Sequence, residues 1–163
     1  KAAGAGPIYM TEPNPERRAF ALSYAADAVF DPSTENVVTA IMAATHGRGV
    51  DVAFEAAGAP ETPDQAARVT RPGGKVIVAG IPHDDRMAFT AGVVRRKGLT
   101  IKLVRRMKHT YPRAIAMVRS GLVDIKPLAT HHFPLEHIRD AFELVSEYRD
   151  GVLRAMIDVH SEP

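Results

Sequence analysis

The sequence predicts an α/β protein with a doubly wound parallel sheet, and two observations carry this prediction. Strand-like runs alternate with helix-like segments of about 10–12 residues, which is the spacing of β-α-β crossover units. The mostly aliphatic run 75–79 lies between Gly73-Gly74 and Gly80, as expected for a strand that is buried on both faces. Because ligands of such sheets bind beyond the carboxyl ends of the strands, Gly80 and Ile81 are candidate ligand-facing residues.

Four further segments have the composition of strands. Residues 8–11 and 28–30 are short apolar runs that end at polar or turn residues, and 50–55 leads into the small residues 56–58. Apolar and polar residues alternate over 99–103, which favours an edge position in the sheet. The predicted order of elements is therefore strand, helix, strand, and so on.

Helix-start residues precede the predicted helices. Asn14 is a suitable cap and Pro15 suits a first helical position, while Ser33 or Thr34 is expected to cap the second helix. Residues 1–5 are interpreted as the tail of another helix. The remaining helices are expected at residues 62–71, 110–120 and 135–145, before a strand-like run at 152–159.

Composition indicates an ordinary globular domain. Of 163 residues, 45% are hydrophobic and 25% are charged, and the formal net charge of +2 is too small to argue for nucleic acid. The chain contains no cysteine, which excludes disulfides and thiolate metal sites. No apolar run approaches the roughly 20 residues that span a bilayer, and residues 1–4 lack the apolar core of a signal peptide. We therefore expect a cytoplasmic protein without a membrane partner.

The order and spacing of several stretches carry a family resemblance. Residues 11–17, 26–29, 49–58 and 72–82 together resemble the medium-chain dehydrogenase/reductase family. Residues 110–114 and the stretch from 127 to 142 are similar to its zinc-type polyol branch, which includes sorbitol dehydrogenase-like enzymes. This resemblance implies a Rossmann-type sheet and hydride transfer between NAD and a secondary alcohol, with an alcohol or polyol as the small-molecule substrate.

The same resemblance implies that parts of the family's fold have no counterpart here. These parts are the amino-terminal catalytic domain with its zinc, the first strand of the nucleotide domain and its glycine-rich turn. In the family's strand order, that strand lies between 8–11 and 50–55, so its absence leaves open strand edges and an apolar seam. We expect 1–122 to be an incomplete nucleotide-binding domain and 123–163 to be a segment of the absent catalytic domain. The chain is therefore expected to be the carboxy-terminal portion of a longer enzyme and to be inactive alone. Alternatively, another polypeptide or a rearranged strand fills the gap in the sheet.

Eight residues are candidates for cofactor binding. Glu12 follows strand 8–11, where a carboxylate can accept hydrogen bonds from two ribose hydroxyls and repel a 2′-phosphate, which favours NAD over NADP. By resemblance, Arg17 lies beside the adenosine and Arg106 near the nicotinamide end. The other candidates lie at strand ends or near the pyrophosphate, and they are Ala57, Gly58, Gly80, Ile81 and Arg154.

Two other groups of residues were weighed against binding roles. Basic residues are frequent in the acid-free stretch 95–113, but without interleaved aromatic residues this stretch does not predict nucleic-acid binding. His131, His132 and His137 have no carboxylate at a recognisable ligand spacing, so no metal site is predicted within this chain. The alternative to an enzyme portion is a non-catalytic nucleotide-binding or interaction module. Because family members commonly pair across the edge strand 99–103, we expect a homo-oligomer, either a dimer or a tetramer.

Overall fold

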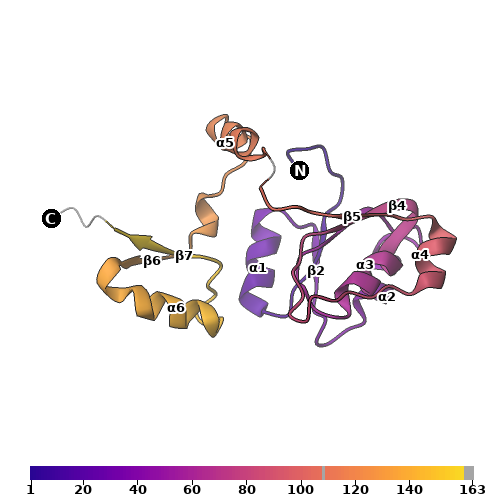
Figure 1. Cartoon of the computed structure of the whole chain (residues 1–163), viewed down its shortest axis with the longest axis horizontal. Coiled ribbons are helices and arrows are strands. Elements are labelled where there is room, and N and C mark those ends of the chain that lie inside the picture. Colours follow the sequence, from indigo (N-terminus) through magenta and orange to yellow (C-terminus); the bar gives the residue numbers. More distant parts are fainter. Residues whose placement is uncertain (108, 160–163) are drawn as a thin grey trace. The chain divides into compact units, whose positions relative to one another are not determined.

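The computed structural model describes residues 1–107 and 109–159, and it confirms the predicted α/β class. Helices and strands alternate along the chain, and three strand pairs are parallel (Figure 1). The chain divides into two compact units. One unit combines Lys1–Val29 with the chain from His109 onward, and the other is the continuous stretch Phe30–Lys108. The predicted boundary between residues 122 and 123 stays a prediction.

A three-stranded parallel sheet is the centre of the continuous unit. Its strands are β3 (Val50–Glu55), β4 (Thr70–Val78) and β5 (Thr100–Leu103), with β4 in the middle. Val76 is fully buried and Val78 nearly so, whereas Lys75 is exposed and Ile77 is half-buried, so the predicted burial is met on one face of the strand and not on both. The edge position predicted for β5 is also confirmed.

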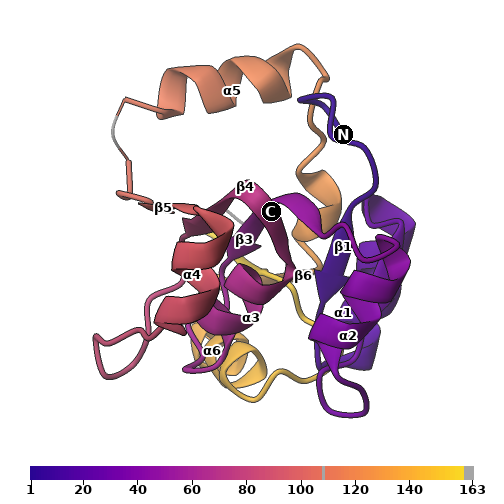
Figure 2. The same cartoon turned by 90° about the vertical axis from the view of Figure 1, so that its right-hand side faces the viewer.

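Three helices belong to the same unit: α2 (Val37–Ala44), α3 (Thr62–Val69) and α4 (Ala91–Lys97). The middle helix, α3, packs on β3 and β4 and also contacts both α2 and α4 (Figure 2). Small side chains make this close packing possible, since Ala66 and Ala67 of α3 are buried. The helix-to-strand packing fixes the positions of the loops that follow β3 and β4.

The other unit joins the two ends of the chain. Strands β1 and β2 form a two-stranded sheet, and β6 pairs in parallel with β7, with α6 packed against both (Figure 1). The absence of a counterpart to the family's intervening strand stays a prediction. The elements of this unit are β1 (Tyr9–Thr11), α1 (Pro15–Tyr24), β2 (Ala28–Phe30, which extends one residue into the other unit), α5 (Tyr111–Arg119), η1 (Lys126–Leu128), β6 (His131–Pro134), η2 (Leu135–His137), α6 (Ile138–Ser146) and β7 (Ala155–Asp158).

Two predictions about the helices were wrong, one about a helix tail and one about a helix cap. Residues 1–5 contain a turn, in which the Gly4 amide donates to the Lys1 carbonyl, rather than a helix tail. The cap of α2 is Asn36, whose side chain accepts a hydrogen bond from the Thr39 amide at 3.0 Å. Ser33 lies before the helix in a local turn, where its amide donates to the Asp31 carboxylate.

Strand β4 begins earlier than the predicted run 75–79, since it starts at Thr70 and includes both Gly73 and Gly74. A Cβ at Gly74 would overlap the Thr70 side chain and lie 2.9 Å from the Arg71 carbonyl oxygen. The pairing register with β3 shifts between Val50 and Val52, beside this glycine pair. The glycines therefore permit an irregular stretch inside the strand.

Candidate functional site

The carboxyl end of β3 is organised around the buried carboxylate of Glu55, of which only 3% is exposed. Its Oε1 atom accepts hydrogen bonds from the Ala57 amide at 2.9 Å, the Gly58 amide at 2.7 Å and the Thr62 hydroxyl at 2.8 Å. A buried carboxylate needs such donors to replace its lost hydration. Glu55 thus joins the end of β3 to the first residue of α3.

The carboxyl end of β4 lies directly against the same loop. The Glu55 carbonyl accepts a hydrogen bond from the Gly80 amide at 3.0 Å. A Cβ at Gly80 would overlap the Glu55 carboxylate and lie 2.5 Å from the Gly58 nitrogen. Gly58 has a φ of +70°, and a Cβ there would lie 2.6 Å from the Ile81 carbonyl oxygen. The structure therefore brings together four predicted site residues, namely Ala57, Gly58, Gly80 and Ile81.

Contacts within the protein therefore explain why positions 58 and 80 are glycines. Their missing side chains allow two strand ends to approach each other, and Ile81 is 74% exposed at the same edge. Exposed small residues and backbone at the carboxyl ends of parallel strands suit a ligand that lies across the strand ends. Arg106 is also exposed and follows β5 in the chain, but no described contact joins its side chain to this group.

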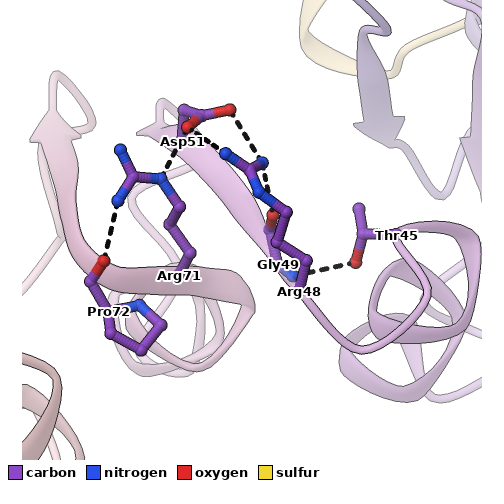
Figure 3. A network of polar contacts seen from close by, with 6 residues as sticks. All are labelled: Thr45, Arg48, Gly49, Asp51, Arg71 and Pro72. Atoms are coloured by element: carbon purple, nitrogen blue, oxygen red, sulfur yellow. Dashed lines mark hydrogen bonds and ion pairs between the residues drawn. The ribbon is translucent and has the colours of Figure 1, made fainter.

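An ion-pair cluster holds the opposite end of β3 and β4 (Figure 3). The Asp51 carboxylate accepts hydrogen bonds from Arg48 at 2.7 and 3.0 Å and from Arg71 at 2.6 Å. The Arg48 and Arg71 guanidinium groups hold the pKa of this carboxyl group well below its usual range. Because Asp51 lies at the amino end of β3, this cluster is separate from the site at the carboxyl end.

Glu12 directly follows β1 and lies at the amino end of α1. Its half-buried carboxylate accepts a hydrogen bond from the Asn14 amide at 2.9 Å. The Asn14 side chain caps the helix, since it accepts from the amides of Glu16 and Arg17, both at 3.0 Å. The carboxylate therefore has a defined position next to the positive end of a helix, and its role toward a cofactor stays a prediction.

Arg17 and Arg154 belong to the same unit as Glu12. The Arg17 guanidinium group donates to the Val152 carbonyl at 3.2 and 2.7 Å and lies 4.7 Å from the centre of the Tyr148 ring. Arg154 is exposed just before β7, and its carbonyl accepts from the Thr130 amide at 3.1 Å. Their predicted roles toward a cofactor stay predictions.

Sequence reasoning did not identify Glu55 as a residue of the site. The signal was present as an acidic residue that ends an apolar strand, followed by small residues and a glycine. A buried carboxylate in this position needs several donors, and the amides of a tight turn provide them.

The three histidines that were considered as metal ligands each pair with an aspartate. The three pairs are His131–Asp150 at 3.2 Å, His132–Asp158 at 3.3 Å and His137–Asp140 at 2.7 Å. Within residues 1–107 and 109–159, no group of three or more histidine, cysteine or acidic side chains is arranged to hold a metal ion. The described residues therefore do not fit a zinc site. None of the helices in this range is long and apolar enough to cross a membrane.

Comparison with known proteins decides the family. Residues 1–120 match the family model described as zinc-binding dehydrogenase. The chain belongs to this family. It is 32% identical to the sorbitol dehydrogenase of Bacillus subtilis over 157 residues, which cover 96% of the chain and 44% of that enzyme. Thus the chain spans less than half the length of this relative.

Solved structures of family members have the same fold. An alcohol dehydrogenase from Thermus sp. ATN1 matches with a TM-score of 0.88 and 28% identity, over 96% of this chain and 45% of that chain. A zinc-binding dehydrogenase from Sinorhizobium meliloti, solved with NADP, matches with a TM-score of 0.84 and 25% identity over 95% and 46% of the two chains. The described part of this chain therefore has the fold of the nucleotide-binding portion of zinc-type dehydrogenases.

Proposed function

We propose that this chain is the cofactor-binding portion of an NAD-dependent, zinc-type alcohol or polyol dehydrogenase. The observation that carries the proposal is the joined carboxyl edge of β3 and β4, where Glu55 positions Gly58 against Gly80 and Ile81. In a family member, this edge is where a dinucleotide would lie across the sheet. The oxidised nicotinamide of the bound cofactor would accept a hydride from the alcohol carbon.

The residues of this chain have binding and orienting roles in the proposal. Glu12 accepts hydrogen bonds from the two adenosine ribose hydroxyls, while Ala57 and Gly58 allow the cofactor to approach the backbone. Gly80 and Ile81 face the nicotinamide riboside. The remaining cations are assigned to the adenosine, the nicotinamide end and the pyrophosphate, and they are Arg17, Arg106 and Arg154, respectively.

NAD is the proposed cofactor because a carboxylate at position 12 repels a 2′-phosphate. The related structure solved with NADP makes the second cofactor a necessary comparison in every binding experiment. Zinc is assigned to residues outside the described part of the chain, since that part contains no fitting ligand set. No step is therefore assigned to a metal within this chain.

The wider organisation is part of the same proposal. Residues 1–122 would form the nucleotide-binding domain, and residues 123–163 would belong to the catalytic domain. The substrate would be a small secondary alcohol or polyol, by analogy with the sorbitol dehydrogenase relative. We also propose a cytoplasmic homo-oligomer that binds neither nucleic acid nor membrane.

Binding and turnover measurements on the natural protein that contains this chain test the proposal. Calorimetry should detect the binding of NAD and a weaker binding of NADP. With a polyol as substrate, reduced nicotinamide should accumulate, and a chelator should stop this reaction. If NAD binds but no alcohol is oxidised, the alternative of a non-catalytic nucleotide-binding module replaces the enzyme. If neither dinucleotide binds, the proposed site is wrong.

A further inference from the structure

The loop that follows α6 is tied to the first turn of α1 by the side chain of Arg17. The Nε and Nη2 atoms of Arg17 both donate to the Val152 carbonyl, at 3.2 and 2.7 Å. The guanidinium carbon lies 4.7 Å from the centre of the Tyr148 ring, which is cation–π distance. We call residues 148–152 the arginine loop.

The packing around this contact is close. Val152 is only 1% exposed, so its carbonyl is presented by a buried residue. A Cβ at Gly151, whose φ is +63°, would lie 3.1 Å from a carboxylate oxygen of Glu16, the residue before Arg17. The arginine loop therefore has little room to shift relative to the start of α1, and Arg17 is held from two sides.

This position matters for the adenosine end of the proposed cofactor site. Glu12 and Arg17 both lie at the amino end of α1, within one cap structure formed by Asn14. A 2′-phosphate on the ribose is bound best by a guanidinium group that offers two parallel donors. The Val152 carbonyl already engages Nε and Nη2, so one of the edges from which the Arg17 guanidinium group can offer two parallel donors is occupied.

The neighbouring arginine is engaged as well. Arg18 donates from Nη1 to the carbonyl oxygens of Glu12 at 2.9 Å and Pro13 at 2.6 Å. These bonds hold Arg18 on the turn between β1 and α1. Both cations that follow Glu12 are thus bound to backbone carbonyls.

We propose that the arginine loop is a determinant of cofactor choice, because Tyr148 and the Val152 carbonyl keep Arg17 from pairing with a 2′-phosphate. This inference rests on the proposed function. It assigns the discrimination against NADP to two parts of the chain: the carboxylate of Glu12 repels the phosphate, and the arginine loop withholds Arg17. Tyr148 is a positioning residue in this scheme, since it acts through Arg17.

The test measures the dissociation constants of NAD and NADP for the natural protein and for Tyr148→Leu. A cation–π contact at an exposed site changes an equilibrium by a factor of about 2–5. We expect the ratio of the NADP to the NAD constant to fall about threefold in Tyr148→Leu. Tyr148→Phe, which retains the ring, should keep the original ratio. Tyr111→Leu is the matched control, because both tyrosines are 60% exposed and both lie in the same unit.

A double variant separates this role from a structural one. Tyr148→Leu combined with Arg17→Met should lose the gain in NADP binding, because the released cation is absent. A gain that persists in the double variant, or a ratio that changes less than twofold in a folded Tyr148→Leu protein, overturns the proposal. If NAD binds to all variants at an unchanged ratio, only this inference fails. If no variant binds either dinucleotide, the proposed function fails with it.

Discussion

At the scale of single residues, each unit has one carboxylate of interest, Glu55 in the continuous unit and Glu12 in the other, and the two differ in burial. Glu55 is almost fully buried and directs its oxygen to protein donors, whereas Glu12 is half-buried and is held by one amide. The first residue therefore shapes the site, and the second remains accessible to a ligand. Each role predicts a different consequence of substitution.

Replacing Glu12 by serine should weaken NAD binding and strengthen NADP binding. Hydrogen bonds to a charged acceptor contribute roughly 1.5–3 kcal/mol each, so a loss of at least about tenfold in NAD affinity is expected. The measurement is the ratio of the two dissociation constants in the natural protein and in Glu12→Ser. A ratio that stays within twofold would mean that Glu12 does not contact the ribose.

Replacing Glu55 by alanine should lower the free energy of unfolding by about 2–4 kcal/mol, because buried donors of Ala57, Gly58 and Thr62 lose their acceptor. The matched control is Glu61→Ala, since Glu61 makes no side-chain cap bond to α3 and should change stability by less than about 0.5 kcal/mol. Urea unfolding followed by circular dichroism gives both values. Equal effects of the two substitutions would contradict the role of Glu55.

At the scale of elements, the sequence predicted β2 and β3 with their observed bounds, because compact apolar runs between turn residues indicate strands. Helix α4 was missed. Its cap residue Thr90 makes no side-chain cap bond to the helix, and the helix is held by a tertiary contact. Lys97 donates to the carbonyl oxygens of Arg68 at 2.5 Å and Thr70 at 2.7 Å, at the end of α3. No local pattern predicts such a contact.

The residues of the candidate site, like the helices and strands, were only partly predictable from the sequence. Its small residues were found because glycine and alanine at strand ends are a local signal. The role of Glu55 was missed because it depends on which amides the turn directs toward its side chain. Likewise, the contact between Arg17 and Val152 joins residues that are far apart in the chain.

The Asp51 cluster predicts how the stability of the β3–β4 pair depends on pH. Bonds from Arg48 and Arg71 lower the pKa of Asp51 in the folded chain, so the folded state binds fewer protons than the unfolded state in mild acid. The stabilisation is present above the unfolded pKa near 3.8 and is lost as pH falls below it. Unfolding midpoints measured from pH 7 to pH 2 should fall less steeply for Asp51→Asn. Parallel curves for the two proteins would contradict this assignment. Asp27 and Asp64, whose pKa values are also lowered, should preserve part of the slope in the variant.

At the scale of the whole molecule, exposed apolar residues lie on the outer strands of the three-stranded sheet. Phe54 of β3 is 73% exposed, and Leu103 of β5 is 65% exposed. Exposed apolar edge strands are surfaces on which chains associate. The expected pairing across β5 stays a prediction, and the exposure of Leu103 suggests where to test it.

Light scattering at micromolar concentration should therefore give the mass of a dimer or a larger species. Leu103→Asp should shift the natural protein toward monomer, since a charge on the edge strand opposes pairing. Leu122→Asp serves as the control, because Leu122 is 55% exposed and lies outside the sheet. A monomeric mass of the unmodified protein would exclude pairing across β5.

The division of the chain into a continuous and a discontinuous unit has a consequence for folding. Phe30–Lys108 makes its contacts between segments that follow one another closely, so they can form early. Lys1–Val29 has some of its partners in the chain from His109 onward, and these contacts require closure of a long loop. During synthesis, residues 1–29 would emerge from the ribosome well before residues 109–159, and helix α1 would wait for this later segment before Arg17 could reach Val152.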